Sequence, residues 1–397
     1  MIEKIINQIN KNRKYLFYAF SILISRGLEY LVLFYAAFYL SKENYGELEF
    51  YKKFIELFAV GLAFGLPSLL LTYTKSKESK VYLNILAIIF ISFLSILVSP
   101  FLYYFDYIFL LIPIFFHSIF FNNGVIPVFF ITQLGSNKAS IYKSVISILF
   151  YIGIFIILVF HPEPQKAFVI INYYLIGLGI IFLLLLFNKY DIKLNPLKKY
   201  FSLFKKLLIS SLTLVISNFA NIMFLYTDIM ILKLISSQPN IDIANYSFAL
   251  NFSNMLVLIP FTIVQVDIEK IKYLANAKPI AYKILKLVLL FSILVFGVYF
   301  SLITTIYEDY ASTLWVFLII LFAKIFHTQS VLHGTLLLIK KQFKLNLKIN
   351  LVFLLLNIGL SYLLFAELRT IGVAIASLIV LSLRFVVLQH YSKYKAK

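Results

Sequence analysis

Long apolar runs dominate this chain and limit the structures that it can form. Each of twelve runs exceeds 18 residues, short polar breaks separate them, and charged residues make up only 13% of the 397 residues. A soluble domain carries about a quarter charged residues, whereas a helix that spans a membrane needs about 20 apolar residues. The pattern therefore predicts an all-α integral membrane protein with about twelve transmembrane helices. The runs cover residues 15–40, 47–73, 81–105, 107–132, 140–160, 167–187, 207–235, 243–266, 281–305, 311–337, 345–365 and 370–390.

Lysine and arginine outside the runs fall mainly in alternate breaks. If the N-terminus is cytoplasmic, 27 of the 36 basic residues lie in inner segments, and three lie in outer loops: Lys42, Lys166 and Arg369. Cytoplasmic loops carry such an excess in membrane proteins. We therefore predict a multi-pass protein of the cell (cytoplasmic) membrane with both termini cytoplasmic. The same rule explains the net charge of +19 without a nucleic-acid partner.

The basic segment 188–206 joins the sixth and seventh runs and divides the helices into equal halves. We predict an N-terminal lobe, 1–187, and a C-terminal lobe, 207–397, around a central cavity. A weak internal echo supports two related lobes. Glu29 precedes Asn44-Tyr45-Gly46 in the first half, and Asp228 precedes Asn245-Tyr246-Ser247 in the second. Internal repeats of this kind are common in transporters.

Motifs for catalysis and cofactor binding are missing from the sequence. It has no cysteine, its five histidines are scattered, and it has neither a P-loop nor a GxGxxG motif. No break is long enough for a soluble catalytic domain, and the first run is too long for a removable signal peptide. We expect no metal, no cofactor and no enzymatic activity.

Charged residues inside the predicted helices are the main candidates for function. Apart from Glu47 and Glu49, which we place at a helix mouth, there are six basic and three acidic residues. They are Arg26, Glu29, Lys52, Lys53, Glu56, Asp228, Lys233, Lys324 and Arg384. Ionisable groups at this depth are costly and usually functional. An excess of basic groups favours an anionic cargo, with phosphate as the obvious candidate.

The first two helices each carry a polar stripe. Arg26 and Glu29 are three residues apart, and one face of the next helix carries Glu49, Lys52, Lys53 and Glu56. At about 1.5 Å per residue, Arg26 lies roughly 16 Å deep, near the midplane. The stripes indicate a shared cavity. The alternative is that Arg26–Glu29 and Lys53–Glu56 are salt bridges that hold the two helices together.

The second half contributes further polar positions. Asn221 and Asp228 share a face of the seventh helix, and Lys324 with His327 lies on the tenth. We expect Arg384 to reach the inner surface as an anchor, because long basic side chains extend toward the interface. His117 is expected to be a hydrogen-bonded packing residue.

Two segments carry a resemblance to a known family. Phe38-Tyr-Leu-Ser-Lys-Glu-Asn-Tyr-Gly46 with Gly61-Leu-Ala-Phe-Gly65-Leu-Pro67 resembles the start of bacterial polysaccharide (O-antigen, Wzx-type) flippases. Tyr226-Thr-Asp228, followed by Ala244-Asn-Tyr246 and Pro260, resembles the opening of their second lobe. These flippases belong to the multidrug/oligosaccharidyl-lipid/polysaccharide exporter superfamily.

The resemblance implies a flippase that moves a polyprenyl-pyrophosphate-linked oligosaccharide from the inner to the outer leaflet by alternating access, for surface polysaccharide assembly. Arg26 and Lys53 would bind the pyrophosphate, with Lys52 and Lys324 as further candidates. Glu29, Glu56, Asp228 and Asn221 would line the cavity or couple transport to H⁺ or Na⁺. Membrane lipids and the polysaccharide polymerase machinery are the implied partners.

Three other functions remain open at this point. The first is an ion-coupled multidrug exporter of the same fold, which an acidic cavity would favour. The second is a membrane enzyme of glycan assembly, which the short loops disfavour. The third is a membrane scaffold without transport, which the charges inside the helices disfavour.

Overall fold

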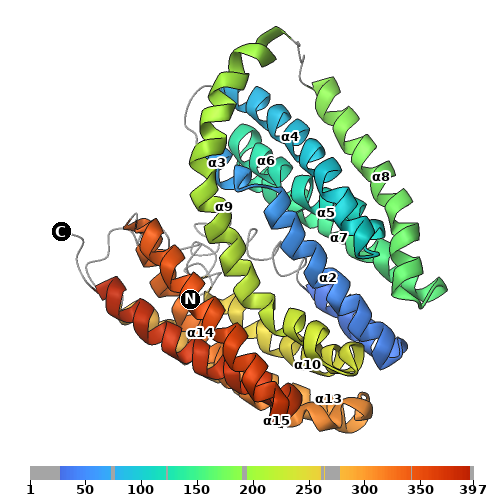
Figure 1. Ribbon diagram of the computed structural model, residues 1–397, viewed down its shortest axis with the longest axis vertical. Helices are drawn as coiled ribbons and strands as arrows, with labels where there is room; N and C mark the ends of the chain where they lie inside the picture. Colours follow the sequence, from blue (N-terminus) through green and yellow to red (C-terminus); the bar gives the residue numbers. More distant parts are fainter. Residues whose placement is uncertain are drawn as a thin grey trace, which may run out of the picture. The chain divides into compact units, whose positions relative to one another are not determined.

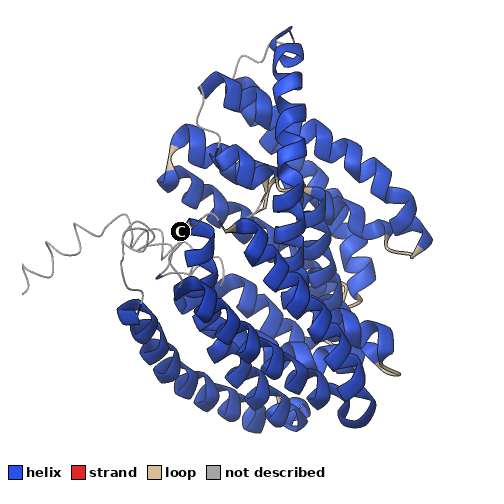
Figure 2. Cartoon of the chain, turned by 60° about the vertical axis from the view of Figure 1, so that its left-hand side comes forward, coloured by secondary structure: helices blue, strands red, loops and turns tan. Residues whose placement is uncertain are grey.

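The structure is a computed structural model that describes residues 27–72, 77–121, 124–189, 195–260, 263, 278–340 and 342–393. Almost all of these residues are helical, and no strand occurs among them (Figure 2). The chain forms two compact units. One contains Met1–Ala36 and Tyr51–Phe219, and the other contains Ala37–Phe50 and Ala220–Lys397.

The first unit is a bundle of helices that pack in chain order. The helix Gly27–Tyr39 begins the described chain, and α2 follows it. Helix α6 packs against α3, α4 and α7, and α8 packs against α5 and α7 (Figure 1). The elements are α2 (Lys42–Leu62) from Tyr51 onward, its earlier residues belonging to the second unit, α3 (Leu66–Thr72), α4 (Lys77–Tyr104), η1 (Ile108–Leu110), α5 (Leu111–Ile119), α6 (Val125–Leu134), α7 (Ser136–Phe160), α8 (Pro164–Lys189) and the first part of α9 (Asn195–Ile235).

The second unit is built around α14, which packs along α15 and also contacts α10 and α13 (Figure 1). Stacked aromatic rings join these helices, as where Tyr299 lies 3.7 Å from Phe317 between ring centroids. The elements are the end of α9, α10 (Pro239–Asn254), η2 (Met255–Val257), α13 (Lys278–Thr305), η3 (Glu308–Thr313), α14 (Leu314–Ile339) and α15 (Phe343–Lys393).

Left-handed residues mark several of the helix boundaries. Phe64 and Gly65 have φ of 51° and 65° and separate α2 from α3, so Gly65 stops a helix here. Asp106 (φ 60°) ends α4. Arg369 (φ 48°) breaks α15, whose 51 residues would otherwise extend about 76 Å, far more than one membrane crossing. The predicted break between the last two apolar runs is therefore confirmed.

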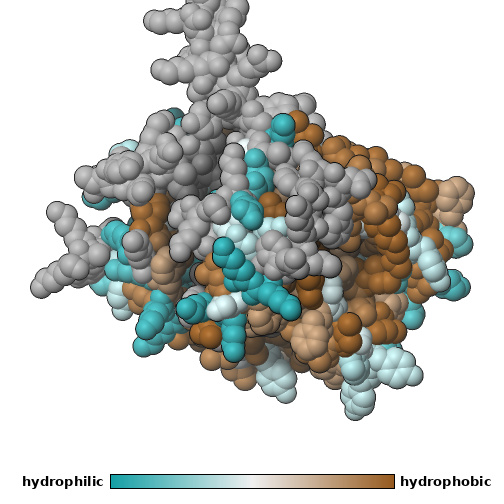
Figure 3. Space-filling model, turned by 90° about the horizontal axis from the view of Figure 1, so that it is seen from above, coloured by the Kyte–Doolittle hydropathy of each residue, from teal (hydrophilic) through white to brown (hydrophobic). Residues whose placement is uncertain are grey.

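Six described helices are long and apolar enough to cross a membrane. They carry large apolar side chains on the outside as well as inside. On α13, for example, Leu290 and Ile293 are exposed while Val288 and Val295 are buried. Figure 3 shows apolar side chains over much of the face that it presents. This distribution is typical of helices that face lipid, and the all-helical membrane fold predicted from the sequence is confirmed.

The inter-lobe segment differs from its expected form. We predicted a loop at 188–206, but α9 begins at Asn195. Lys198, Lys199, Lys205 and Lys206 therefore lie on the first turns of a 41-residue helix. Lysine is a good helix former, and Pro196 is tolerated because it stands in the first turn, where its missing N–H costs no hydrogen bond.

Candidate functional site

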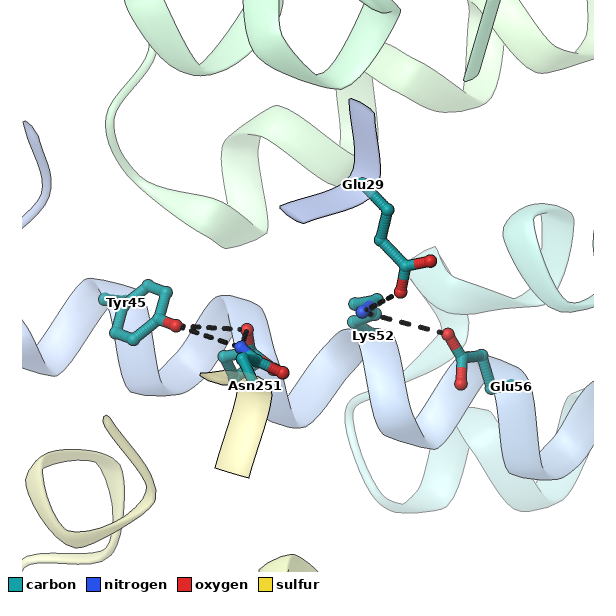
Figure 4. Close-up of polar contacts among 6 residues, drawn as sticks. Glu29, Tyr45, Lys52, Glu56 and Asn251 are labelled. Atoms are coloured by element: carbon teal, nitrogen blue, oxygen red, sulfur yellow. Dashed lines mark hydrogen bonds and ion pairs between the residues drawn. The ribbon is translucent and has the colours of Figure 1, made fainter. Parts of the chain in front are cut away.

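The polar stripes of the first two helices meet inside the first unit. Glu29 extends from the helix Gly27–Tyr39 toward α2, and its Oε1 lies 2.6 Å from Lys52 Nζ (Figure 4). Lys52 Nζ also lies 4.0 Å from Glu56 Oε1, one turn further along α2. Both side chains of the closer pair are largely buried. Lys52 therefore links the two carboxylates, as Figure 4 shows.

The residues proposed to bind pyrophosphate are only partly within the described chain. Arg26 lies outside the described residues. Lys53 is on α2 and is buried, with 4% of its surface exposed.

His117 is buried on α5, and its Nδ1 lies 2.9 Å from the carbonyl oxygen of Pro113. The prediction that His117 is a hydrogen-bonded packing residue is confirmed.

Asp228 on α9 is the centre of a buried polar cluster in the second unit. Its carboxylate accepts hydrogen bonds from Tyr246 on α10, from Asn357 Nδ2 (2.9 Å) and from Ser377 Oγ (2.6 Å), both on α15. Asp228 and Tyr246, which belong to the second half of the internal echo, are thus joined directly by a hydrogen bond. Neutral donors surround this aspartate, so it is held in place by three other side chains.

A small pocket adjoins this cluster. Its polar lining consists of Asp228, Tyr246, Lys324 and Ser377, and its apolar lining of Leu250, Ile320, Ala323 and Leu381. Lys324 is buried on α14 and is the basic residue of this lining. A carboxylate beside two hydroxyls can hold a proton or a small cation, whereas the nearby ammonium of Lys324 would oppose a cation. Asn221 lies on α9, but its side chain is outside the described residues.

Two further basic residues lie within the second unit, and one of them corrects an expectation. Arg384 is buried in the second unit and donates to Asn350 Oδ1 from Nε (3.2 Å) and Nη2 (2.9 Å), so the prediction of a surface anchor was wrong. Lys233 at the end of α9 donates to Asn240 Oδ1 over 2.9 Å. Neutral amide oxygens accept all three hydrogen bonds.

Sequence reasoning missed several residues of these clusters. Asn357 and Ser377 were not identified, and Glu49 was set aside as a residue at a helix mouth. The structure buries Glu49 completely, next to Tyr45 and Asn251 (Figure 4). The Asn-Tyr echo had marked Tyr45, so a search for acids one turn away from it would have found Glu49.

Buried charge is balanced rather than basic in the described residues. Three acidic side chains, Glu29, Glu49 and Asp228, are buried there. Three basic ones, Lys53, Lys324 and Arg384, are buried as well. The positive excess expected from the sequence therefore does not extend to the buried set. No group of three or more His, Cys, Asp or Glu able to hold a metal ion occurs in the described chain.

The chain belongs to the polysaccharide biosynthesis protein family, whose family model matches residues 12–268. No curated protein sequence matches it. Its fold is similar to that of the lipid II flippase MurJ in an inward closed conformation. The TM-score is 0.66 and the sequences are 18% identical, over 96% of this chain and 88% of the other.

A second solved structure, a MATE protein in complex with MaL6, is also similar. The TM-score is 0.53 at 14% identity, over 96% of this chain and 95% of the other. At such low identity these similarities establish the fold alone. The family match over residues 12–268 confirms the resemblance to polysaccharide biosynthesis proteins that the sequence indicated.

Proposed function

We propose that this protein is a flippase that moves a polyprenyl-pyrophosphate-linked oligosaccharide from the inner to the outer leaflet of the cytoplasmic membrane. Movement by alternating access between two lobes, 1–187 and 207–397, would deliver the lipid for surface polysaccharide assembly. The observation that carries the proposal is membership of the polysaccharide biosynthesis family over residues 12–268. A fold similar to a lipid II flippase supports it.

Basic residues of the first two helices supply the chemistry for the pyrophosphate. Lys52 and Lys53 lie on α2, and Lys52 is already beside the carboxylate of Glu29. Lysine and arginine are suited to phosphate because they combine positive charge with several donors. Arg26 and Lys53 are the proposed main contacts, with Lys52 and Lys324 as further ones.

The test is deletion of the gene in its source organism. We expect loss of a surface polysaccharide and accumulation of its lipid-linked precursor in the inner leaflet, with both effects reversed by the intact gene. Unchanged polysaccharide together with new sensitivity to cationic drugs would contradict the proposal. That result would favour the multidrug exporter, for which the similarity to a MATE protein is the supporting observation.

Transport is proposed to draw on an ion gradient through Asp228. The sequence has no nucleotide-binding motif, so the driving energy must come from elsewhere. The pocket beside Asp228 presents a carboxylate and two hydroxyls, which suits H⁺ or Na⁺. Release of the ion would leave a charged aspartate that three donors and Lys324 stabilise.

A further inference from the structure

The first turns of α9 carry a dense group of lysines. Helix α9 has 41 residues and would extend about 61 Å at 1.5 Å per residue, about twice the apolar thickness of a membrane. Its first turns also precede the apolar run predicted from residue 207. No acidic residue occurs in this helix before Asp228. Its basic face consists of five exposed residues, Lys198, Lys199, Ser202, Lys205 and Lys206.

Aromatic contacts fix the direction in which this part of α9 faces. The ring of Tyr200 stacks on that of Tyr82, with 5.2 Å between the centroids and 12° between the planes. Phe204, one turn further on, is buried with its ring centroid 6.0 Å from that of Phe90. Tyr82 and Phe90 belong to α4, and all four rings lie within the first unit. Residues four apart share one side of a helix, so these rings hold one side of α9 against α4 and the basic face stands on the other.

Large apolar side chains are exposed beside the lysines. Phe201 is 59% exposed and Ile209 is 65% exposed, on the turns that carry the basic face or directly follow it. A helix side that combines lysines with large apolar side chains is typical of helices at the interface between lipid and water. This combination favours a phospholipid over an anion dissolved in water, because only the lipid offers acyl chains to the apolar groups.

The spacing of the lysines suits phosphate groups at a membrane surface. Lys198 and Lys205 are seven residues apart, as are Lys199 and Lys206, so each pair lies along one line of the helix about 10 Å long. Lysine side chains are long and flexible and reach toward the interface. The hydroxyl of Ser202, between the two pairs, adds a further donor. The basic face therefore presents positive charge and several donors over two turns.

We propose that the basic face of α9 binds the head groups of anionic phospholipids. The predicted orientation of the chain puts this face at the inner leaflet, whose negative charge attracts lysines close to a membrane span. The ammonium groups contact phosphodiester oxygens, and Phe201 and Ile209 lie against the acyl chains. None of these residues is among those proposed to bind the cargo or a coupling ion, so the lipid site does not depend on what the protein transports.

Local quenching by labelled lipids tests this site in the full chain. A neutral fluorophore is attached to the variant Ser202→Cys, since the chain has no other cysteine, and the protein is reconstituted in phosphatidylcholine vesicles. The vesicles also contain phosphatidylglycerol or phosphatidylcholine with a nitroxide quencher on the acyl chain near the head group. One lysine at an anionic surface strengthens the attraction by about fivefold. Labelled phosphatidylglycerol should therefore give half-maximal quenching at a mole fraction at least about fivefold lower than labelled phosphatidylcholine.

Replacement of the lysines separates a specific site from a general effect of charge. In the variant Lys198→Gln/Lys199→Gln/Lys205→Gln/Lys206→Gln, the two labelled lipids should quench equally, and glutamine maintains the helix. The matched control replaces four other exposed lysines that are also predicted to lie inside, and it should retain the preference for phosphatidylglycerol. The control positions are Lys283, Lys286, Lys344 and Lys348.

Equal quenching by the two lipids in the protein with all its lysines would overturn the proposal. A preference that persists without the lysines of the basic face would overturn it as well, as would an equal loss of preference in the control variant. Inorganic phosphate added to the vesicles distinguishes a lipid from a dissolved anion. If phosphate abolishes the preference at an ionic strength at which chloride does not, the face binds a dissolved anion and the lipid proposal is wrong.

Discussion

Gly46 on α2 lies where this helix crosses α10, at a distance that leaves no space for a side chain. A Cβ there would come within 1.7 Å of the carbonyl oxygen of Asn240 and 3.0 Å of the backbone nitrogen of Ala244. Both contacts are backbone atoms, so relief requires a helix to move. Small residues permit this close approach between membrane helices. Gly46 ends the first segment of the internal echo, Asn44-Tyr45-Gly46, and Ala244 directly precedes the second, Asn245-Tyr246-Ser247.

Gly46→Ala should destabilise the protein by about 1–3 kcal/mol, as other overpacked substitutions do. The measurement is thermal unfolding in detergent. Gly297→Ala on α13 is the control, because nothing lies within 4 Å of its added Cβ and alanine favours a helix. Equal melting temperatures for both variants would contradict the crossing geometry.

Asp228→Asn should abolish ion-driven transport while the protein still folds, because asparagine retains the shape and can accept hydrogen bonds. One charge moved across 100 mV is worth about 2.3 kcal/mol, a factor of about fifty in accumulation. The measurement is flipping in vesicles with imposed H⁺, Na⁺ or potential gradients.

Asp106→Asn provides the control for Asp228. Asp106 is exposed and has a positive φ, which asparagine tolerates, so this variant should transport normally. If the rate of wild-type transport does not depend on pH, Na⁺ or membrane potential, Asp228 has no coupling role.

At the scale of helices, substitutions of Glu29 and Lys52 can show whether Lys52 has only a structural role or also binds the substrate. Breaking a buried pair by Lys52→Gln alone should cost about 3–5 kcal/mol, because the buried carboxylate of Glu29 loses its ion pair with Lys52. The double variant Glu29→Gln with Lys52→Gln should restore membrane abundance, since removal of both partners is often nearly neutral. If Lys52 also binds pyrophosphate, the double variant will still fail to export polysaccharide.

Immunoblots and polysaccharide export should be measured together for this comparison. The exposed pair Lys166–Glu163, 2.8 Å apart, is the control because surface pairs contribute little. Its double neutral variant should change neither readout. A fully active Glu29→Gln/Lys52→Gln protein would remove Lys52 from the substrate site. The same design applies to Arg26 and Lys53, which carry the main binding proposal.

For the whole molecule, the predicted orientation can be tested with single cysteines, because the chain has none of its own. Exposed residues are available at helix ends predicted to lie outside and at others predicted to lie inside. Cysteines at Glu43, Glu163 and Glu308 should react with an impermeant thiol reagent added outside intact cells. Cysteines at Glu78, Lys198 and Lys344 should react only after the membrane is opened. A cysteine of the first group that does not react in intact cells, or one of the second group that does, would contradict twelve spans with cytoplasmic termini.

The amino-acid sequence alone determined the helical membrane architecture. The lengths of the apolar runs exclude soluble folds, because only the lipid of a membrane can cover so many apolar side chains. The break at Asp106 between the runs 81–105 and 107–132 also coincides with the end of α4. The polar stripes at Glu29 and Lys52 were predictable because the helical period of 3.6 places residues three or four apart on one face.

Only the tertiary structure decided which buried polar groups meet. Asp228 receives hydrogen bonds from Asn357 and Ser377, which are 129 and 149 residues away, so no local spacing could reveal them. Glu49 lies near the start of a helix, where depth alone suggests contact with water. Asn251 and Tyr310, far along the chain, cover it instead. Burial depends on what packs against a residue, and this packing depends on contacts that form only when the whole chain folds.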